Sequence, residues 1–186
     1  MSLATAGGMS IEAFLQLPDD GIERELVRGE VRQTGVTICN KAHSRCLVRL
    51  TSVLESWAEM HADFAVLAGE AGFQLEKDPD TSVGIDLVVA PASVVNFMES
   101  DSTIVQGLPI VAIEIVSPSD TQGRIREKTQ LYLRSGVSAV WLVDPEEKTV
   151  RIHRAGRPPQ QFNESEVIAD TAELPGLKVN LSRVFR

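Results

Sequence analysis

The sequence predicts one domain of the α/β (α+β) class, in which helices flank a mixed β-sheet. The 186 residues are enough to bury a full core, and 43% of them are hydrophobic. Helix-like and strand-like runs follow one another without an internal linker or repeat, which indicates a single layered domain. The run VSAVWLVD at 137–144 is almost entirely apolar, as is typical of a central strand buried on both faces.

The N-terminal part is expected to form a short helix and a hairpin. Ser10 precedes the run IEAFLQL and is a favourable N-cap, and Pro18 ends this helix. Two short strands are predicted within 22–34, with the turn at Arg28-Gly29.

The clearest helix is predicted over 40–62. Its apolar side chains recur at helical spacing, and they are Cys46, Leu50, Val53, Leu54, Trp57 and His61. His43 extends this stripe and forms an i, i+4, i+7 set with Cys39 and Cys46, which resembles a zinc cluster. Positions seven apart on a helix are separated by about 10 Å of rise, whereas zinc holds its ligands at about 2.3 Å. We therefore expect buried, reduced thiols rather than a zinc site or a disulfide.

Strands dominate the middle of the chain. Three strand-like runs separated by turn residues are predicted at 64–68, 72–76 and 83–90. The segment 91–109 is expected to be a loop or a short helix. A further strand is predicted over 110–116, where the sequence reads IVAIEIV.

A helix and a hairpin are predicted after this strand. The residues SPSD break the strand and supply the chemistry of a helix start, and the helix over 121–135 ends at Gly136, a favourable C-cap. The buried strand 137–144 is followed by a DPEE turn and by a hairpin partner over 149–154. The tail is expected to pack its apolar residues onto the body, namely Leu174, Leu177, Leu181 and Phe185.

Bulk properties restrict the classes of partner. The net charge of −8 and the pI near 4.9 disfavour loose, sequence-independent nucleic-acid binding, which needs a cationic surface. No apolar run approaches the roughly 20 residues that span a bilayer, and no signal peptide is visible, so we expect a cytoplasmic protein without a membrane partner. The small, polar segment 1–9 is expected to be disordered or in part an expression scar, which leaves 10–186 as the folded domain.

Two acids lie inside strand-like apolar runs, Asp86 in IDLVV and Glu114 in AIEIV. Burying a carboxylate is costly unless it is paired, protonated or bound to a metal. If the two strands are neighbours, both carboxylates can lie close together, and a divalent cation is the usual remedy for their repulsion. In the alternative interpretation each acid lies at a strand end and is solvated.

Lys128 lies beside the apolar stripe of the helix that follows the Glu114 strand. It is spaced i, i+3, i+6 and i+7 with Ile125, Leu131 and Tyr132. Since this helix should pack back over the sheet, its ammonium group can approach Glu114. The alternative is a structural salt bridge with an extended lysine stem lying along the apolar surface.

Three stretches of the chain resemble one known family. EIVSPSD, REKTQLYLRSGV and WLVDPEEKTVRIH, with weaker matches at both ends, resemble the Uma family of restriction endonucleases in the PD-(D/E)xK superfamily. The resemblance implies a restriction-endonuclease-like core and metal-dependent hydrolysis of phosphodiesters. It places Asp86 at the motif's aspartate and Glu114 at its second acid. The chain departs from the motif at Ile85, where the motif has proline, and at Val116, where it has lysine; Lys128 takes over the lysine's place.

The expected site holds Mg²⁺ or Mn²⁺ through Asp86, Glu114 and the backbone carbonyl of Ile115, with Lys128 orienting the attacking water or stabilising charge on the phosphorus. Three further residues are weaker candidates for the same site. Tyr132 lies one turn beyond Lys128, where it either hydrogen-bonds in the site or packs in the core. A lone histidine on an apolar stripe, such as His43, is more often a core residue than a site residue. Glu25 lies in the hairpin, where the alternative to a role in the site is solvation or pairing with an arginine.

A basic row on the long helix is the candidate nucleic-acid surface. Lys41, Arg45 and Arg49 are spaced i, i+4, i+8, although an ordinary solvated helix face explains them as well. The preferred function is a Mg²⁺-dependent DNA endonuclease. Restriction-type nucleases often pair to cut two strands, so this function is compatible with a homodimer, although the sequence carries no interface signature. The alternatives are a non-catalytic nuclease-fold binding module, which the acidic pI favours, and a hydrolase of a small phosphodiester.

Overall fold

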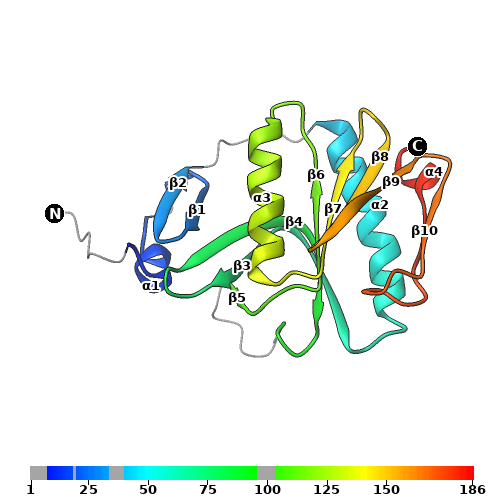
Figure 1. Ribbon diagram of the computed structural model, residues 1–186. Helices are drawn as coiled ribbons and strands as arrows, with labels where there is room; N and C mark the ends of the chain where they lie inside the picture. Colours follow the sequence, from blue (N-terminus) through cyan, green and yellow to red (C-terminus); the bar gives the residue numbers. More distant parts are fainter. Residues whose placement is uncertain (1–7, 19, 34–39, 96–103) are drawn as a thin grey trace.

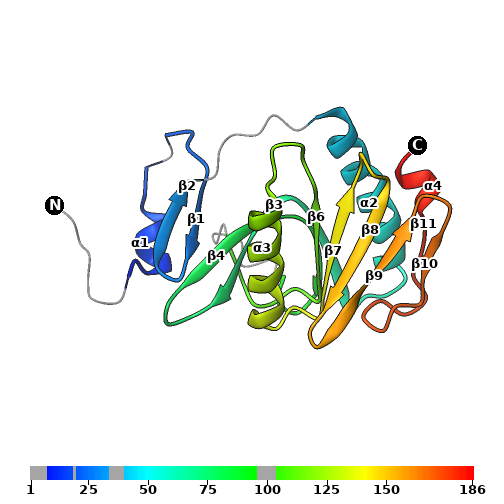
Figure 2. The ribbon, with the colours of Figure 1, turned by 45° about the horizontal axis from the view of Figure 1, so that its top comes forward.

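A computed structural model describes residues 8–18, 20–33, 40–95 and 104–186. Its centre is a mixed sheet with the strand order β2-β1-β4-β6-β7-β8-β9, to which β3 and β5 are joined through β4. The helices are α1 (Ile11–Leu15), α2 (Lys41–Ala58), α3 (Gln122–Ser135) and α4 (Leu181–Val184). The α1–β1–β2 unit lies at one end of the molecule and α4 at the other (Figures 1 and 2).

The N-terminal unit has the helix and hairpin expected from the sequence. The Ser10 side chain caps α1 by accepting a hydrogen bond from the backbone N–H of Ala13. Strands β1 (Arg24–Val27) and β2 (Glu30–Gln33) are joined by Arg28 and Gly29, which both have positive φ, as a tight hairpin turn requires. Residues 1–7 lie outside the described residues, whereas the Met9 N–H already bonds to the carbonyl of Gly29.

The prediction of two separate strands at 64–68 and 72–76 is wrong, because these residues form one long strand, β3 (Phe64–Glu76). The chain does not turn back at Gly69 but continues through it as part of the same strand. The register passes from Ala68↔Leu87 to Ala71↔Ile85, so two residues of β3, Gly69 and Glu70, lie opposite one residue of β4 (Thr81–Pro91). This is a β-bulge, and it lies directly beside Asp86.

The remaining elements agree with the expected order. Strand β6 (Val111–Ile115) runs antiparallel to β4 and parallel to β7 (Ala139–Asp144), and α3 forms the crossover between them, capped by Thr121 and by left-handed Gly136. The long helix α2 ends at Ala58, four residues before the predicted end. The segment expected to be a loop or short helix contains the short strand β5 (Val105–Gln106), and part of it, 96–103, lies outside the described residues.

Alternate residues of the central strands face the two sides of the sheet. The side facing α2 carries Leu87, Ile113 and Trp141, which pack with the apolar stripe of that helix. The other side carries Val88, Ala112 and Val140, which pack with Leu131 and Tyr132 of α3. Figure 1 shows α3 in front of the sheet and α2 behind it. The strands therefore separate the α2 face from the α3 face.

The C-terminal part completes the α2 side. Strands β8 (Thr149–Arg154) and β9 (Arg157–Asn163) extend the sheet, and β10 (Val167–Ala169) pairs with β11 (Lys178–Asn180). The expected tail residues Leu174, Leu177 and Leu181 are buried, and Phe185 packs partly buried against the same cluster. Cys46 is a buried free thiol, while Cys39 lies outside the described residues. No helix in the described part is long and apolar enough to cross a membrane.

Candidate active site

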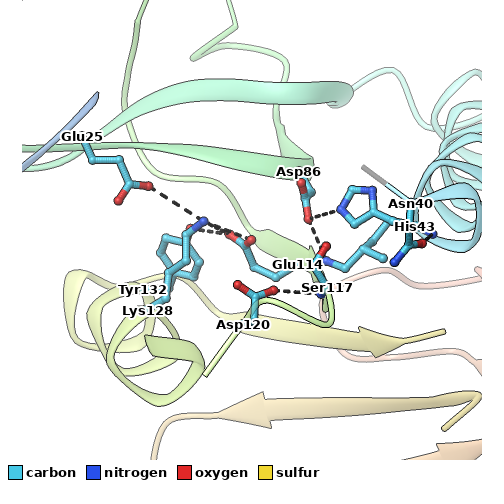
Figure 3. Close-up of polar contacts among 10 residues, drawn as sticks. Glu25, Asn40, His43, Asp86, Glu114, Ser117, Asp120, Lys128 and Tyr132 are labelled. Carbon is cyan, nitrogen blue, oxygen red and sulfur yellow. Dashed lines mark hydrogen bonds and ion pairs between the residues drawn. The ribbon is translucent and has the colours of Figure 1, made fainter. Parts of the chain in front are cut away.

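Asp86 and Glu114 lie at the point where two neighbouring strands separate. The last registered pair of β4 and β6 on this side is Leu87↔Ile113, and the two acids are the next residues on either strand. Asp86 is buried and the Glu114 side chain is only 15% exposed. The structure thus brings together the two carboxylates that the sequence placed in apolar runs (Figure 3).

The Asp86 carboxylate receives two hydrogen bonds on one oxygen. Its Oδ2 accepts the backbone N–H of Ile115 at 2.8 Å and lies 3.3 Å from Nε2 of His43. Burial alone would raise the pKa of Asp86, but the hydrogen bonds from His43 and Ile115 outweigh it and lower that pKa below its ordinary value. Asp86 is therefore held in its charged form inside the protein.

Glu114 is bonded from α3. Tyr132 Oη donates to Oε1 at 2.5 Å, and Lys128 Nζ lies 3.1 Å from Oε2 and 3.0 Å from Oε1. Burial raises the pKa of Glu114 to about 7, with a further contribution from the charge of Asp86, and the favourable contacts to Lys128 and Tyr132 offset only part of this effect. The proximity of Lys128 to Glu114, predicted from the helical stripe, is present in the structure.

Lys128 is a cation among several acids. Its Nζ is also 3.9 Å from the carboxylate of Glu25, which reaches it from β1. Burial would lower the pKa of Lys128, but the nearby charges of Glu114, Glu25 and Glu70 raise it above its ordinary value. The surrounding acids therefore favour the protonated form of Lys128, which suits a hydrogen-bond donor better than a general base.

Glu70 is the residue of this cluster that the sequence prediction missed. It has φ +59° in the β-bulge, and its carboxylate lies over Gly84, where an added Cβ would come within 2.6 Å of Oε2. The residue is exposed as a whole, but the desolvation of its carboxylate and the charge of Asp86 raise its pKa. The signal in the sequence was a glycine followed by an acid between two strand-like runs, which we interpreted as a turn.

The basic row of α2 is engaged with the C-terminal segment. Arg45 Nε donates to the carbonyl oxygen of Arg186 at 3.0 Å, and Arg49 donates to the carbonyls of Val184 and Arg186. Arg49 also lines a pocket of about 370 Å³ between α2 and α4. The structure thus gives two members of the row a contact within the fold, while Lys41 is exposed.

The arrangement offers oxygen ligands on the α3 side of the sheet. Across 8–18, 20–33, 40–95 and 104–186, no group of three or more His, Cys, Asp or Glu side chains is placed to hold a metal ion. A cation here would accordingly rely on Asp86 and Glu114 together with backbone, water or substrate oxygens. Magnesium is commonly bound in this way, by one or two carboxylates and the oxygens of a phosphate.

Comparisons with known proteins agree with this architecture. The sequence matches the model of the Uma2 family, described as "Putative restriction endonuclease", over residues 11–182. No curated protein matches it significantly. A crystal structure of "a putative nuclease belonging to DUF820" from Anabaena variabilis ATCC 29413 superimposes with a TM-score of 0.79 at 22% identity, over 95% of this chain and 97% of that chain. The likeness confirms the predicted mixed-sheet fold, and the family match shows that the chain belongs to the Uma2 family.

Proposed function

We propose that this protein is a divalent-metal-dependent endonuclease that hydrolyses phosphodiester bonds of DNA. The observation that carries the proposal is the convergence of Asp86, Glu114 and Lys128 from β4, β6 and α3 at one point. Two carboxylates can hold a divalent cation, and an ammonium group beside them can stabilise charge that develops on a phosphate. Membership of the Uma2 family supports the same reaction class.

The residues present fit a hard divalent cation. Asp86 is kept charged, and the Glu114 carboxylate is buried beside it with a pKa of about 7, so the pair carries unfavourable repulsion that a cation would relieve. The missing Cβ at Gly84 leaves space for a third carboxylate, that of Glu70, beside the pair. We propose Mg²⁺ or Mn²⁺ with Asp86, Glu114 and the carbonyl of Ile115 as its protein ligands.

Such a cation supplies Lewis-acid activation of the phosphate and a lowered pKa for a bound water. The chain's own residues position the reactants around it. Lys128 remains protonated and can donate hydrogen bonds to phosphate oxygens as their negative charge grows. Tyr132 donates a hydrogen bond to Glu114 and so holds its carboxylate in place. Glu25, which lies on β1, limits the movement of the Lys128 ammonium group.

Cleavage of supercoiled plasmid DNA with Mg²⁺ or Mn²⁺ tests the proposal. We expect Asp86→Asn and Lys128→Ala to reduce the cleavage rate by about 10²–10³-fold, the size of effect seen when one preorganised electrostatic contact is lost. Lys148→Ala is the matched control, because Lys148 forms an exposed ion pair with Glu164 on the far hairpin. Wild-type cleavage by both site variants would contradict the assignment, and a folded wild type without metal-dependent cleavage would favour a non-catalytic module.

Hydrolysis of a small phosphodiester is a second candidate. Arg45 and Arg49, two members of the expected phosphate-tracking row, already bond to the C-terminal carbonyls, and the net charge of the chain is −8. A small substrate needs no extended basic surface. Bis(p-nitrophenyl) phosphate distinguishes a small-substrate hydrolase from a DNA endonuclease. Its hydrolysis by the wild type, with loss of activity in Asp86→Asn and Lys128→Ala and with plasmid and linear DNA left intact, would support the small-substrate reaction.

A further inference from the structure

His43 enters the site from the face of the sheet opposite to Lys128. It lies in the first turn of α2, where its backbone N–H donates to the capping side chain of Asn40 at 2.8 Å. Its side chain is buried, with a residue exposure of 5%. The cap and the surrounding core thus fix the ring at the edge of the gap between β4 and β6 (Figure 3).

The ring meets the Asp86 carboxylate at the same oxygen that the sheet already holds. His43 Nε2 is 3.3 Å from Oδ2, and the backbone N–H of Ile115 donates to this atom at 2.8 Å. One donor comes from α2 and the other from β6. Together they fix the rotation of the carboxylate through Oδ2, while the Glu70 side chain also interacts with Asp86.

We infer that His43 is a positioning residue, which holds Asp86 so that its Oδ1 is presented to the catalytic cation. The inference rests on the proposed function, since it presupposes that Asp86 is a metal ligand. Hydrogen bonds to the outer oxygen of a ligating carboxylate orient it and strengthen metal binding. His43 itself touches neither the cation nor the substrate in this assignment.

The second ring nitrogen of His43, Nδ1, gives the ring no additional anchor within the described residues. Among the described residues, the buried Nδ1 of His43 has no hydrogen-bond partner, which costs stability. His61 on the same helix shows the contrast, because its Nδ1 bonds to the carbonyl of Trp57 and its ring stacks on the indole. In the part of the chain that the structure describes, the polar contact that the His43 ring makes is the one to Asp86, and a charged Asp86 requires a proton on Nε2 for this hydrogen bond.

Calorimetric titration of Mn²⁺ into the folded chain tests this role without relying on catalysis. We expect His43→Leu to weaken Mn²⁺ binding by about 10–100-fold, the usual effect of losing an outer partner of a metal ligand. His43→Gln should recover most of the affinity, because its amide N–H can donate to Oδ2. His153→Leu is the matched control, since His153 on β8 also has a buried, unpartnered ring nitrogen but no contact with Asp86.

The outcomes separate this inference from the proposed function. If the wild type binds Mn²⁺ and Asp86→Asn does not, but His43→Leu binds as tightly as the wild type, the positioning role is overturned and the metal site stands. Equal weakening by His43→Gln and His43→Leu, or by His153→Leu, also overturns it, because the loss then does not follow the hydrogen bond. A folded wild type that binds no Mn²⁺ overturns both the positioning role and the proposed metal site. Circular dichroism confirms that each protein is folded. If His43→Leu is unfolded, the Mn²⁺ affinity of His43→Gln decides the test.

Discussion

Two clusters of acids and bases in this molecule differ in their balance of charge. On β8, Arg154 forms two hydrogen bonds with Glu173 at 2.7 and 2.9 Å, and their side chains are 14% and 9% exposed. In the candidate site, the Lys128 ammonium group faces the carboxylates of Glu114, Glu25 and Glu70. The pKa of Glu173 is lowered by its bonds to Arg154, whereas burial raises the pKa of Glu114 to about 7.

The difference separates a matched pair from a surplus of one charge. Arg154 and Glu173 neutralise each other and join the loop before β11 to the sheet, so their contact stabilises the fold. The site contains more carboxylates than bases on the α3 side, an arrangement that is costly in the absence of a cation. A surplus of buried acid is therefore the better indicator of a metal-dependent function than a buried ion pair is.

The largest expected effect concerns the matched pair. Arg154→Met keeps most of the apolar stem but leaves Glu173 without its partner in a largely buried position. Breaking a buried pair in this way lowers the free energy of unfolding by about 3 kcal/mol. Urea unfolding at pH 7 measures it, with Lys148→Met as the control, because Lys148 and Glu164 are half-exposed. A loss for Arg154→Met no larger than that of the control would show that the pair behaves as a surface ion pair.

A smaller effect is expected from pH. Because the pKa of Glu173 in the folded state is below its ordinary value of 4.5, its ion pair stabilises the fold above that value and loses this contribution as the pH falls through the folded-state pKa. The stability difference between the wild type and Glu173→Gln should therefore be constant near pH 7 and shrink towards pH 3. Urea unfolding curves for both proteins at several pH values provide the measurement. A difference that does not change with pH would mean that the Glu173 charge contributes nothing to stability.

The smallest stability effect is expected in the candidate site. In Gly84→Ala, the new Cβ would lie 2.6 Å from Oε2 of Glu70, which is the far end of a flexible side chain and can move aside. We expect the free energy of unfolding to change by less than about 1 kcal/mol, as for other glycine-to-alanine changes in strands. Mn²⁺ affinity should fall several-fold, because Glu70 is displaced from the neighbourhood of Asp86. Glu70→Gln in the same titration is the comparison; unchanged affinity in both would remove Glu70 from the site.

Much of the site could be predicted from local patterns. The alternation of strand residues and the helical stripe singled out Asp86, Glu114 and Lys128, because each pattern depends only on the period of its own element. That β4 and β6 are neighbours was a condition of the prediction, which the strand pairing fulfils. The caps of α3 at Thr121 and Gly136 are also local, which is why the predicted bounds of this helix are nearly those observed. Family resemblance and structural likeness agree with that fold.

By itself, the sequence determined the order of the elements, the mixed sheet and the two acids with their lysine, since these follow from periodicity and short-range chemistry. The tertiary structure alone decided that β3 is one strand with a bulge that brings Glu70 to Asp86. It also decided that Arg45 and Arg49 bond to the C-terminal segment and that His43 meets Asp86 across the sheet. These contacts join residues 16 to 141 positions apart, and their partners depend on how strands and helices pack, which no local pattern records.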